Sequence, residues 1–385
     1  MTSTQAYDSQ HLKQERLKNL QAEMKRMGIG ACFLGEGLNV KYVLDVLIPG
    51  GRVFVPREGA AIALVRPRDM PYVKLTHPDV ELTYYHQTEA WRPGFESKIA
   101  RFVEGMTGYM SRAGVRDLPL AVDQLDPTAL LALDRAGVQI IDSLPVVEFA
   151  RSVKTSDEVE IYRTLGKQYS QVFTLFRDNV RPGITEKQLQ AMVVGAWQEV
   201  GGDDILQINV CSGQNMNPWR RWATDRPLQE GEFVGIDFHG RSPSGLLGDT
   251  SRTYLVGGNP SPEQRDLYKR AWEYVHGVAD AVRAGRTHAD VVELVPPVLE
   301  KYQQQHDNYH IVHSVGMVPQ GYPKLDRLRV PDDDTFKENQ ILAIECFFAE
   351  VGSDTAVKLE EMILVHDGPA EFITGGVPYE SSIIG

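Results

Sequence analysis

The 385-residue chain has only three cysteines, no long apolar run and no cluster of basic residues. The cysteines are far apart and odd in number, which excludes a disulfide framework or a zinc-knuckle spacing and indicates a reducing cytoplasm; they are Cys32, Cys211 and Cys346. No stretch of about 18 apolar residues is present, and the N-terminus has no apolar signal core, so we expect neither a membrane span nor a secretory leader. The net charge is −12. With no basic stripe, we expect no nucleic-acid partner and no anionic membrane partner.

The remaining composition is that of an ordinary globular protein, with 42% apolar and 24% charged residues. A chain of this length is expected to form about two domains. We place the boundary near residue 150, where the composition changes at "VEFARSVKTSDEVE". The prediction is therefore an α/β fold with a smaller domain at 1–150 and a larger one at 151–385.

The first of these domains is expected to alternate helices and strands. Apolar positions at helical spacing predict a surface helix over 9–27. Buried strands are expected in "GIGACFLG" and "NVKYVLDV", a hairpin in "GRVFVPREGAAIALVRP", and a strand–helix–strand unit over 118–144.

The second domain is expected to begin with capped helices. "KTSDEVE" has the Ser/Thr cap and first-turn acids of a helix start, and Thr185 caps the next helix, which Gly201 and Gly202 end. Two further helices are predicted in 261–285 and 287–306. Apolar strands that carry unexpected acids lie between and after these helices, at 233–238, 249–256, 341–350 and 357–365.

Those acids are the candidate site. Alternate residues of a strand share a face, so Asp237 and His239 are expected to point the same way, and the turn-forming link "GRSPSGLL" brings Asp237 close to Asp249. Glu345 lies inside an apolar run, Glu360 follows a "GSDT" turn, and His313 precedes a Ser-Val-Gly bend.

Each acid taken alone is more simply explained as a solvent-facing residue. Together, four carboxylates and one imidazole in apolar strands match the charge of two divalent cations. Oxygen ligands with one imidazole suit Mn, Fe or Co, with Zn as an alternative. Two such ions in one site activate water and polarise a substrate oxygen.

The order and spacing of these residues resemble the pita-bread metallohydrolases of peptidase family M24, which include prolidases, aminopeptidases P and creatinase. The resemblance covers nearly the whole chain and implies a curved, mostly antiparallel sheet in the larger domain and a creatinase-type α/β domain before it. It implies a homodimer and a small-molecule substrate. It also implies the metal ligands Asp237, Asp249, His313, Glu345 and Glu360.

The chain departs from the proline-directed members at three positions. Trp219 stands where they carry a histidine, Gln320 lies near the place of a second histidine, and Lys358 replaces the usual arginine two residues before the last ligand. Because both proton-handling histidines are replaced, Xaa-Pro cleavage is kept only as a second alternative.

One branch of the family, the dimethylsulfoniopropionate lyases, is similar in its "NPW" segment and in the twelve-residue gap from Asp237 to Asp249. In that branch another aspartate follows the first ligand by two positions, where this chain has His239. The proposed base of that branch falls in a region that here contains Pro319 and Gln320.

Several further residues are candidates for catalysis or substrate binding. His239 is expected to act as a sixth ligand or as an acid–base group; the alternative is an outward-facing residue at a strand end. Trp219, Arg220 and Arg221 are expected to line the pocket and grip a carboxylate; the alternative is that the arginines are solvated and Trp222 packs in a core. Roles in proton donation or binding are also assigned to a second group: Tyr309, His310, Glu345 and Lys358.

The sequence therefore predicts a cytoplasmic, dimetal-dependent enzyme that hydrolyses a C–N or amide bond in a small carboxylate-bearing molecule. The first alternative is a carbon–sulfur lyase acting on dimethylsulfoniopropionate or a related betaine. A non-catalytic binding protein on the same scaffold is the third hypothesis, and the complete set of five ligands argues against it.

Overall fold

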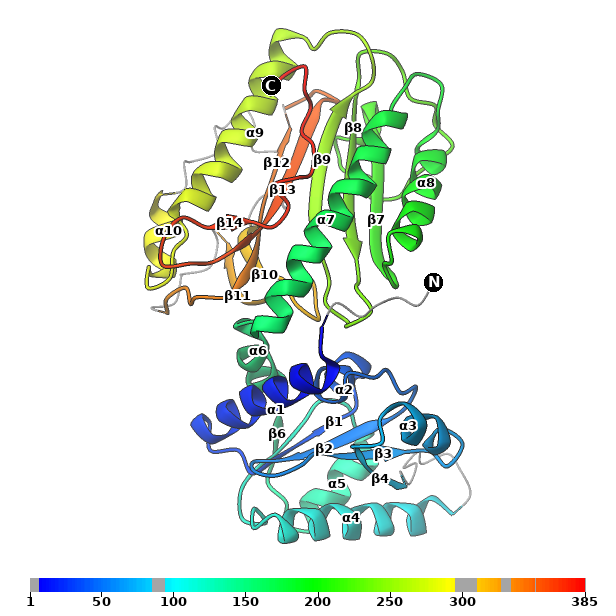
Figure 1. The fold of residues 1–385 in the computed structure, drawn as a ribbon, viewed down its shortest axis with the longest axis vertical. Helices are drawn as coiled ribbons and strands as arrows, with labels where there is room; N and C mark the ends of the chain where they lie inside the picture. Colours follow the sequence, from blue (N-terminus) through cyan, green and yellow to red (C-terminus); the bar gives the residue numbers. More distant parts are fainter. Residues whose placement is uncertain (1–6, 85–93, 295–309, 327–333, 350, 385) are drawn as a thin grey trace. The chain divides into compact units, whose positions relative to one another are not determined.

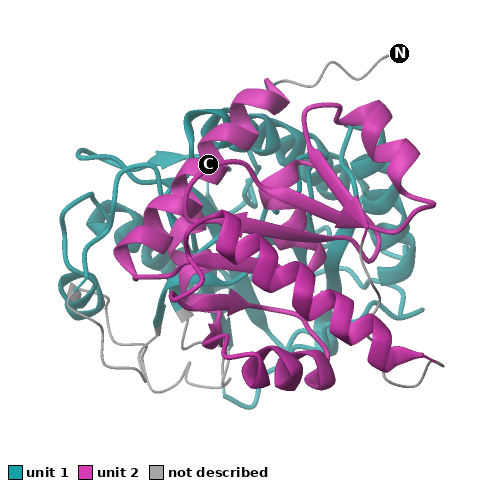
Figure 2. Cartoon of the chain, turned by 90° about the horizontal axis from the view of Figure 1, so that it is seen from below, with its two compact units in different colours: residues 1–7, 152–385 teal, residues 8–151 magenta. Residues whose placement is uncertain are grey.

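The structure is a computed structural model that describes residues 7–84, 94–294, 310–326, 334–349 and 351–384. The chain divides into two compact units (Figure 2). One unit is Asp8–Arg151, and the other is Ser152–Gly385 together with Met1–Tyr7.

The unit Asp8–Arg151 contains a six-stranded mixed sheet in the order β4-β3-β2-β1-β5-β6 (Figure 1). Its strands are β1 (Ala31–Leu34), β2 (Arg52–Pro56), β3 (Ile62–Val65), β4 (Glu81–Tyr84), β5 (Leu120–Val122) and β6 (Ile140–Asp142). Its helices are α1 (Ser9–Arg26), α2 (Gly37–Leu44), α3 (Met70–Thr76), α4 (Phe95–Arg112), α5 (Pro127–Arg135) and α6 (Leu144–Ser152). The β2–β3 hairpin and the β5–α5–β6 unit are confirmed.

The prediction of a strand in "NVKYVLDV" is wrong, because most of this segment lies in helix α2. The Glu36 side chain caps the helix by accepting a hydrogen bond from the Asn39 backbone N–H at 2.9 Å. The Asn39 side chain also donates to Asp123 at the end of β5. The apolar side chains Val40, Val43 and Leu44 satisfy helical spacing as well as they satisfy a buried strand, and these polar contacts select the helix.

The larger unit contains an antiparallel sheet in the order β11-β10-β12-β13-β9-β8-β7, with a short strand paired to β13. Its strands are β7 (Ile205–Ser212), β8 (Phe233–Gly240), β9 (Thr250–Leu255), β10 (His310–Ser314), β11 (Gly321–Asp326), β12 (Ile341–Ala349), β13 (Ala356–Leu364) and β14 (Glu371–Phe372). Its helices are α7 (Ser156–Asn179), α8 (Glu186–Glu199), α9 (Pro262–Ala281) and α10 (His288–Leu294). The predicted α/β class and the mainly antiparallel sheet are confirmed. In the described part of the chain, no helix has the length and apolarity needed to cross a membrane.

The predicted helix starts of this unit are confirmed by their caps. Thr155, Thr185 and Ser261 each close a capping box at the start of α7, α8 and α9. Such a cap contributes about 1 kcal/mol to stability. These caps set the positions at which the helices begin.

Strand β12 shows how one strand serves both a core and a site. Its side chains Leu342, Ile344 and Cys346 belong to the buried cluster that α9 joins, and α9 packs on β12 and β13 (Figure 1). The intervening residues Glu345 and Phe347 face the opposite side of the sheet, because side chains alternate along a strand. A carboxylate is thereby held against a rigid apolar layer.

Candidate metal centre

The polar residues of the site form a row across four neighbouring strands. The register pairs Asp237 of β8 with Ser251 of β9, Ser251 with Glu360 of β13, and Glu360 with Glu345 of β12. Directly opposed residues share one face of a sheet. Strand pairing therefore brings three carboxylates from distant parts of the sequence to one face, where like charges would repel unless a cation or proton intervened.

Asp237 is held by neighbours on both sides. Ser251 Oγ lies 2.9 Å from Asp237 Oδ1 and also 2.9 Å from Glu360 Oε2. From β7, Asn209 Nδ2 donates to Asp237 Oδ2 at 3.0 Å. These contacts leave the carboxylate 4% exposed and fixed in direction, as metal ligands usually are.

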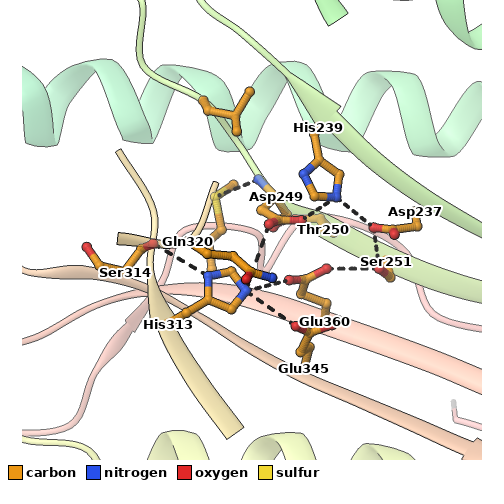
Figure 3. Close-up of polar contacts among 12 residues, drawn as sticks. Asp237, His239, Asp249, Thr250, Ser251, His313, Ser314, Gln320, Glu345 and Glu360 are labelled. Atoms are coloured by element: carbon orange, nitrogen blue, oxygen red, sulfur yellow. Dashed lines mark hydrogen bonds and ion pairs between the residues drawn. The ribbon is translucent and has the colours of Figure 1, made fainter. Parts of the chain in front are cut away.

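His239 points into the site, on the face of Asp237 (Figure 3). Its Nε2 atom lies 3.2 Å from Asp237 Oδ1 and 3.2 Å from Asp249 Oδ1. The outward-facing alternative is therefore wrong for this residue. Atoms of Asp237, His239 and Asp249 come within 4.8 Å of one another and form a group that could hold a cation.

A second group of three shares Asp249 with the first. It consists of Asp249, His313 and Glu360, all buried, with atoms again within 4.8 Å of one another. Nε2 of His313 lies 3.9 Å from Asp249 Oδ2, 3.6 Å from Glu360 Oε1 and 3.4 Å from Glu345 Oε1 (Figure 3). Glu345 thus joins this second group. Two adjacent groups joined by one carboxylate are the arrangement expected for a pair of cations.

Lys358 places a positive charge beside the carboxylate row. Its Nζ lies 3.0 Å from Glu345 Oε2, 2.9 Å from Ser251 Oγ, 3.6 Å from Glu360 Oε2 and 3.7 Å from Asp237 Oδ2. Burial alone would lower the pKa of Lys358, but Asp237 and Glu345 outweigh burial and raise it well above its ordinary value. The ammonium group is therefore charged at neutral pH.

The titratable groups show that the cluster without metal is short of positive charge. Burial and the charges of Glu360 and Asp237 raise the pKa of Asp249 well above its ordinary value. Burial would lower the pKa of His313, but Glu345 and Glu360 outweigh it and raise the pKa to about 9. His313 thus holds a proton at neutral pH, and the shifted pKa of Asp249 favours the protonated form of its carboxyl group. A divalent cation would displace those protons, so metal affinity should fall as the pH is lowered.

Two buried atoms of the cluster fit a metal better than they fit any protein partner. Among the described residues, Asp249 Oδ1 and His313 Nε2 find no hydrogen bond of acceptable geometry, although both are buried. A buried polar atom without a hydrogen bond costs about 1–3 kcal/mol. Both atoms border the two groups defined above, and carboxylate oxygen with imidazole nitrogen suits divalent transition metals. The residues present therefore fit a pair of such ions.

A cavity of about 180 Å³ opens over this centre. Part of its wall is aromatic, since Trp219 contacts Phe347 edge to face with ring centroids 5.7 Å apart. The full lining is Leu206, Gln207, Trp219, Arg221, Asp237, His239, Asp249, Pro319, Gln320, Glu345, Phe347, Lys358 and Glu360. The space suits a small molecule rather than a folded chain.

The remaining residues predicted to bind substrate or transfer protons lie in different surroundings. Arg220 and Arg221 are both exposed, and of the two only Arg221 belongs to the cavity lining. Trp222 is 74% exposed, so the alternative of a core tryptophan at this position is wrong. Tyr309 lies outside the described residues, and His310 is described only as the first backbone position of β10.

Sequence reasoning assigned no role to Ser251, Asn209 or Phe347, which touch or line the site. Ser251 shares a strand face with Asp249 in "GDTSRT", and this pattern could have identified it. Asn209 reaches the site only through the pairing of β7 with β8, which has no signal in the local sequence.

Comparison with known proteins gives one family match and several relatives. The family model for metallopeptidase family M24 matches residues 160–367. Dimethylsulfoniopropionate lyase DddP of Roseobacter denitrificans is 25% identical over 284 residues, which are 69% of this chain and 61% of that protein. The Xaa-Pro dipeptidase of Pyrococcus furiosus is 22% identical over 233 residues, 60% of this chain and 65% of that protein. The chain thus spans less than two thirds of the length of these curated relatives.

Solved structures extend the likeness to the whole fold. The Xaa-Pro dipeptidase from Bacillus anthracis superposes with a TM-score of 0.78 at 19% identity, covering 96% of this chain and 99% of that one. Dipeptidase PepE from Mycobacterium ulcerans superposes with a TM-score of 0.78 at 20% identity, covering 97% and 98%. At these identities the superpositions support the fold only.

Proposed function

The chain belongs to metallopeptidase family M24, and from this premise we propose that it is a dimetal-dependent hydrolase of a C–N or amide bond in a small carboxylate-bearing molecule. One observation carries the proposal. Two buried ligand groups share Asp249 and open into a cavity for a small molecule. When bound, a pair of divalent cations polarises a substrate oxygen and lowers the pKa of water.

The ligand residues divide between two positions. Asp237, His239 and Asp249 would hold one ion, and Asp249 would also serve the other. The ligands of the second ion would be Asp249, His313, Glu345 and Glu360. Mn, Fe or Co suits this oxygen-rich set, with Zn as an alternative.

The cavity residues would bind and orient the substrate. Arg221 offers a guanidinium for the carboxylate, and Trp219 and Phe347 provide an apolar wall. Glu345 Oε2 accepts a hydrogen bond from Lys358 Nζ and borders the cavity. We assign Glu345 the transfer of a proton from the attacking water to the leaving nitrogen, with Lys358 holding its carboxylate in place.

A carbon–sulfur lyase is the second candidate, and the aromatic wall favours it. The faces of Trp219 and Phe347 could receive a sulfonium or quaternary ammonium group, as aromatic rings commonly do. DddP, a relative named as a dimethylsulfoniopropionate lyase, aligns with 69% of this chain. In this reaction a base removes a proton next to the carboxylate, the C–S bond breaks, and the sulfide leaves with the bonding electron pair. Xaa-Pro dipeptide hydrolysis is the next alternative.

Assembly and compartment belong to the same proposal. We propose a cytoplasmic homodimer. All three cysteines are buried free thiols, which is compatible with a reducing compartment.

Metal uptake and a substrate panel test the proposed function. The purified protein should bind about two transition-metal ions per chain, and a chelator should abolish its activity. The metal-loaded protein is then assayed with N-acyl amino acids, Xaa-Pro dipeptides and dimethylsulfoniopropionate. Release of an amine supports the hydrolase, and release of dimethyl sulfide supports the lyase. A protein that takes up no transition metal when supplied with it contradicts both.

His239→Ala should remove one of the two ions, because His239 Nε2 lies at equal distances from the two carboxylates of the first group. We expect the affinity of that position to fall by roughly 10- to 100-fold or more. His239→Asp should restore the metal content. Pulsed electron paramagnetic resonance of the manganese-loaded protein should lose the signal of one imidazole nitrogen. Full metal content combined with a loss of kcat would instead make His239 an acid–base group.

A further inference from the structure

A buried carboxylate outside the metal centre gathers an unusual number of hydrogen bonds. Glu186, the first residue of α8, is 0% exposed. Its Oε1 accepts from the backbone N–H of Ser212 at 2.7 Å and from Ser212 Oγ at 2.8 Å. Its Oε2 accepts from the backbone N–H of Thr224 at 2.8 Å and from Thr224 Oγ1 at 2.7 Å. Asn215 Nδ2 reaches both oxygens, at 3.0 and 3.2 Å.

Ser212 and Thr224 flank one loop, and Asn215 lies inside it. Ser212 ends β7, and Thr224 lies on the far side of the segment 213–223. Each carboxylate oxygen of Glu186 is therefore committed to one end of that segment, which we call the 213–223 loop. A buried charge needs this many donors to offset its loss of water.

The same loop lines part of the cavity beside the candidate metal centre. Trp219 and Arg221 line the cavity, and the Trp219 ring passes so close to Gly235 of β8 that a Cβ there would lie 3.0 Å from it. Two residues before Trp219, Asn217 Nδ2 donates to the carbonyl of Ser353, which precedes β13, at 2.7 Å. The loop has little internal secondary structure beyond the single turn Gly213–Asn215, so its shape depends on such anchors.

We propose that Glu186 is a positioning residue that fixes the 213–223 loop over the cavity and thereby sets substrate affinity. It acts through Trp219 and Arg221 and makes no contact with the carboxylate row. The link to affinity rests on the proposed function, because the cavity must be where substrate binds. The rival explanation is that Glu186 only stabilises the start of α8.

Glu186→Gln tests the proposal with little change of shape. A glutamine can accept through one atom only, so its amide nitrogen must face the donors of Ser212 or those of Thr224. One end of the loop then loses its acceptor. We expect KM to rise by about tenfold while kcat stays within about threefold and the metal content is unchanged.

Native-state proteolysis measures how firmly the 213–223 loop is held, and it needs no enzyme substrate. Arg220 and Arg221 are exposed in the loop, and trypsin cleaves after arginine. Cleavage after these residues should be about tenfold faster in Glu186→Gln than in the natural protein.

Gln188→Ala is the matched control. Gln188 closes the capping box of the same helix with Thr185 but makes no hydrogen bond to the 213–223 loop within the described residues. This variant should lower the melting temperature without changing KM or loop cleavage. If Glu186→Gln behaves in the same way, the proposal is overturned. A natural protein with no metal-dependent activity would refute the proposed function, while the cleavage rates would still decide whether Glu186 holds the loop.

Discussion

Asp249→Ala is expected to remove both metal ions and to lower kcat/KM by roughly three orders of magnitude, a loss of about 4 kcal/mol of transition-state stabilisation. Asp249 is 2% exposed and belongs to both ligand groups. Its loss leaves each group without the carboxylate that joins them. Elemental analysis of the dialysed variant measures the metal content directly.

The variant should nevertheless stay folded without metal. Burial and neighbouring carboxylates raise the pKa of Asp249, so the native protein gains no stability from its charge. Because the folded state raises the pKa of this carboxyl group, ionising it destabilises the folded protein once the pH exceeds the ordinary pKa of an aspartate. The alanine substitution removes that loss of stability. The metal-free melting temperature at neutral pH should therefore stay the same or rise.

Asp225→Ala is the control for this experiment, since Asp225 is an exposed partner of Lys187 and belongs neither to the two ligand groups nor to the cavity lining. It should keep both ions and full activity. Two ions retained by Asp249→Ala would show that the two groups do not depend on a shared ligand.

Glu361→Gln should produce the largest loss of stability, about 3–5 kcal/mol, because it leaves a buried arginine without its counter-charge. Arg252 and Glu361 form a fully buried ion pair between β9 and β13, with side chains 0% and 1% exposed. The same guanidinium donates to the carbonyl of Glu360 at 2.7 Å and lies 4.1 Å from the centre of the Tyr379 ring. Denaturant unfolding of the metal-free protein measures the loss.

Asp225→Asn provides the exposed counterpart. It breaks the surface pair of Asp225 with Lys187, whose side chains are 84% and 55% exposed, and should cost less than about 1 kcal/mol. Replacing both members of the buried pair, as Arg252→Met with Glu361→Leu, should cost less than Glu361→Gln alone. Equal losses from the buried and the exposed single variants would contradict the role assigned to the buried pair.

Much of this fold was accessible from local pattern. The helix starts at Thr155 and Thr185 and the strands around Asp237 and Glu345 follow from caps and apolar periodicity, which act over a few neighbouring residues. The segment around Val40 was not accessible in this way. Its apolar run suits either element, and a contact with Asp123, more than eighty residues away, decides for the helix.

The candidate site likewise contains residues that the sequence identified and residues that only the structure identified. Residue types and their order were enough to identify five candidate ligands, since buried acids in apolar strands need a counter-charge. Local pattern could not distinguish Arg221 from Arg220. Both are exposed, and only the folded loop makes the first part of the cavity lining.

The sequence by itself determined the family, the fold class and which residue types could hold metal, because those properties depend on chemistry written in short motifs. Tertiary structure decided the rest. Strand register aligned Asp237, Ser251, Glu360 and Glu345 in one row, turned His239 inward and made Asp249 common to two groups. The physical reason is that strand pairing is long-range. A shift of one residue would move every side chain of a strand to the other face, and only the packed core excludes that shift.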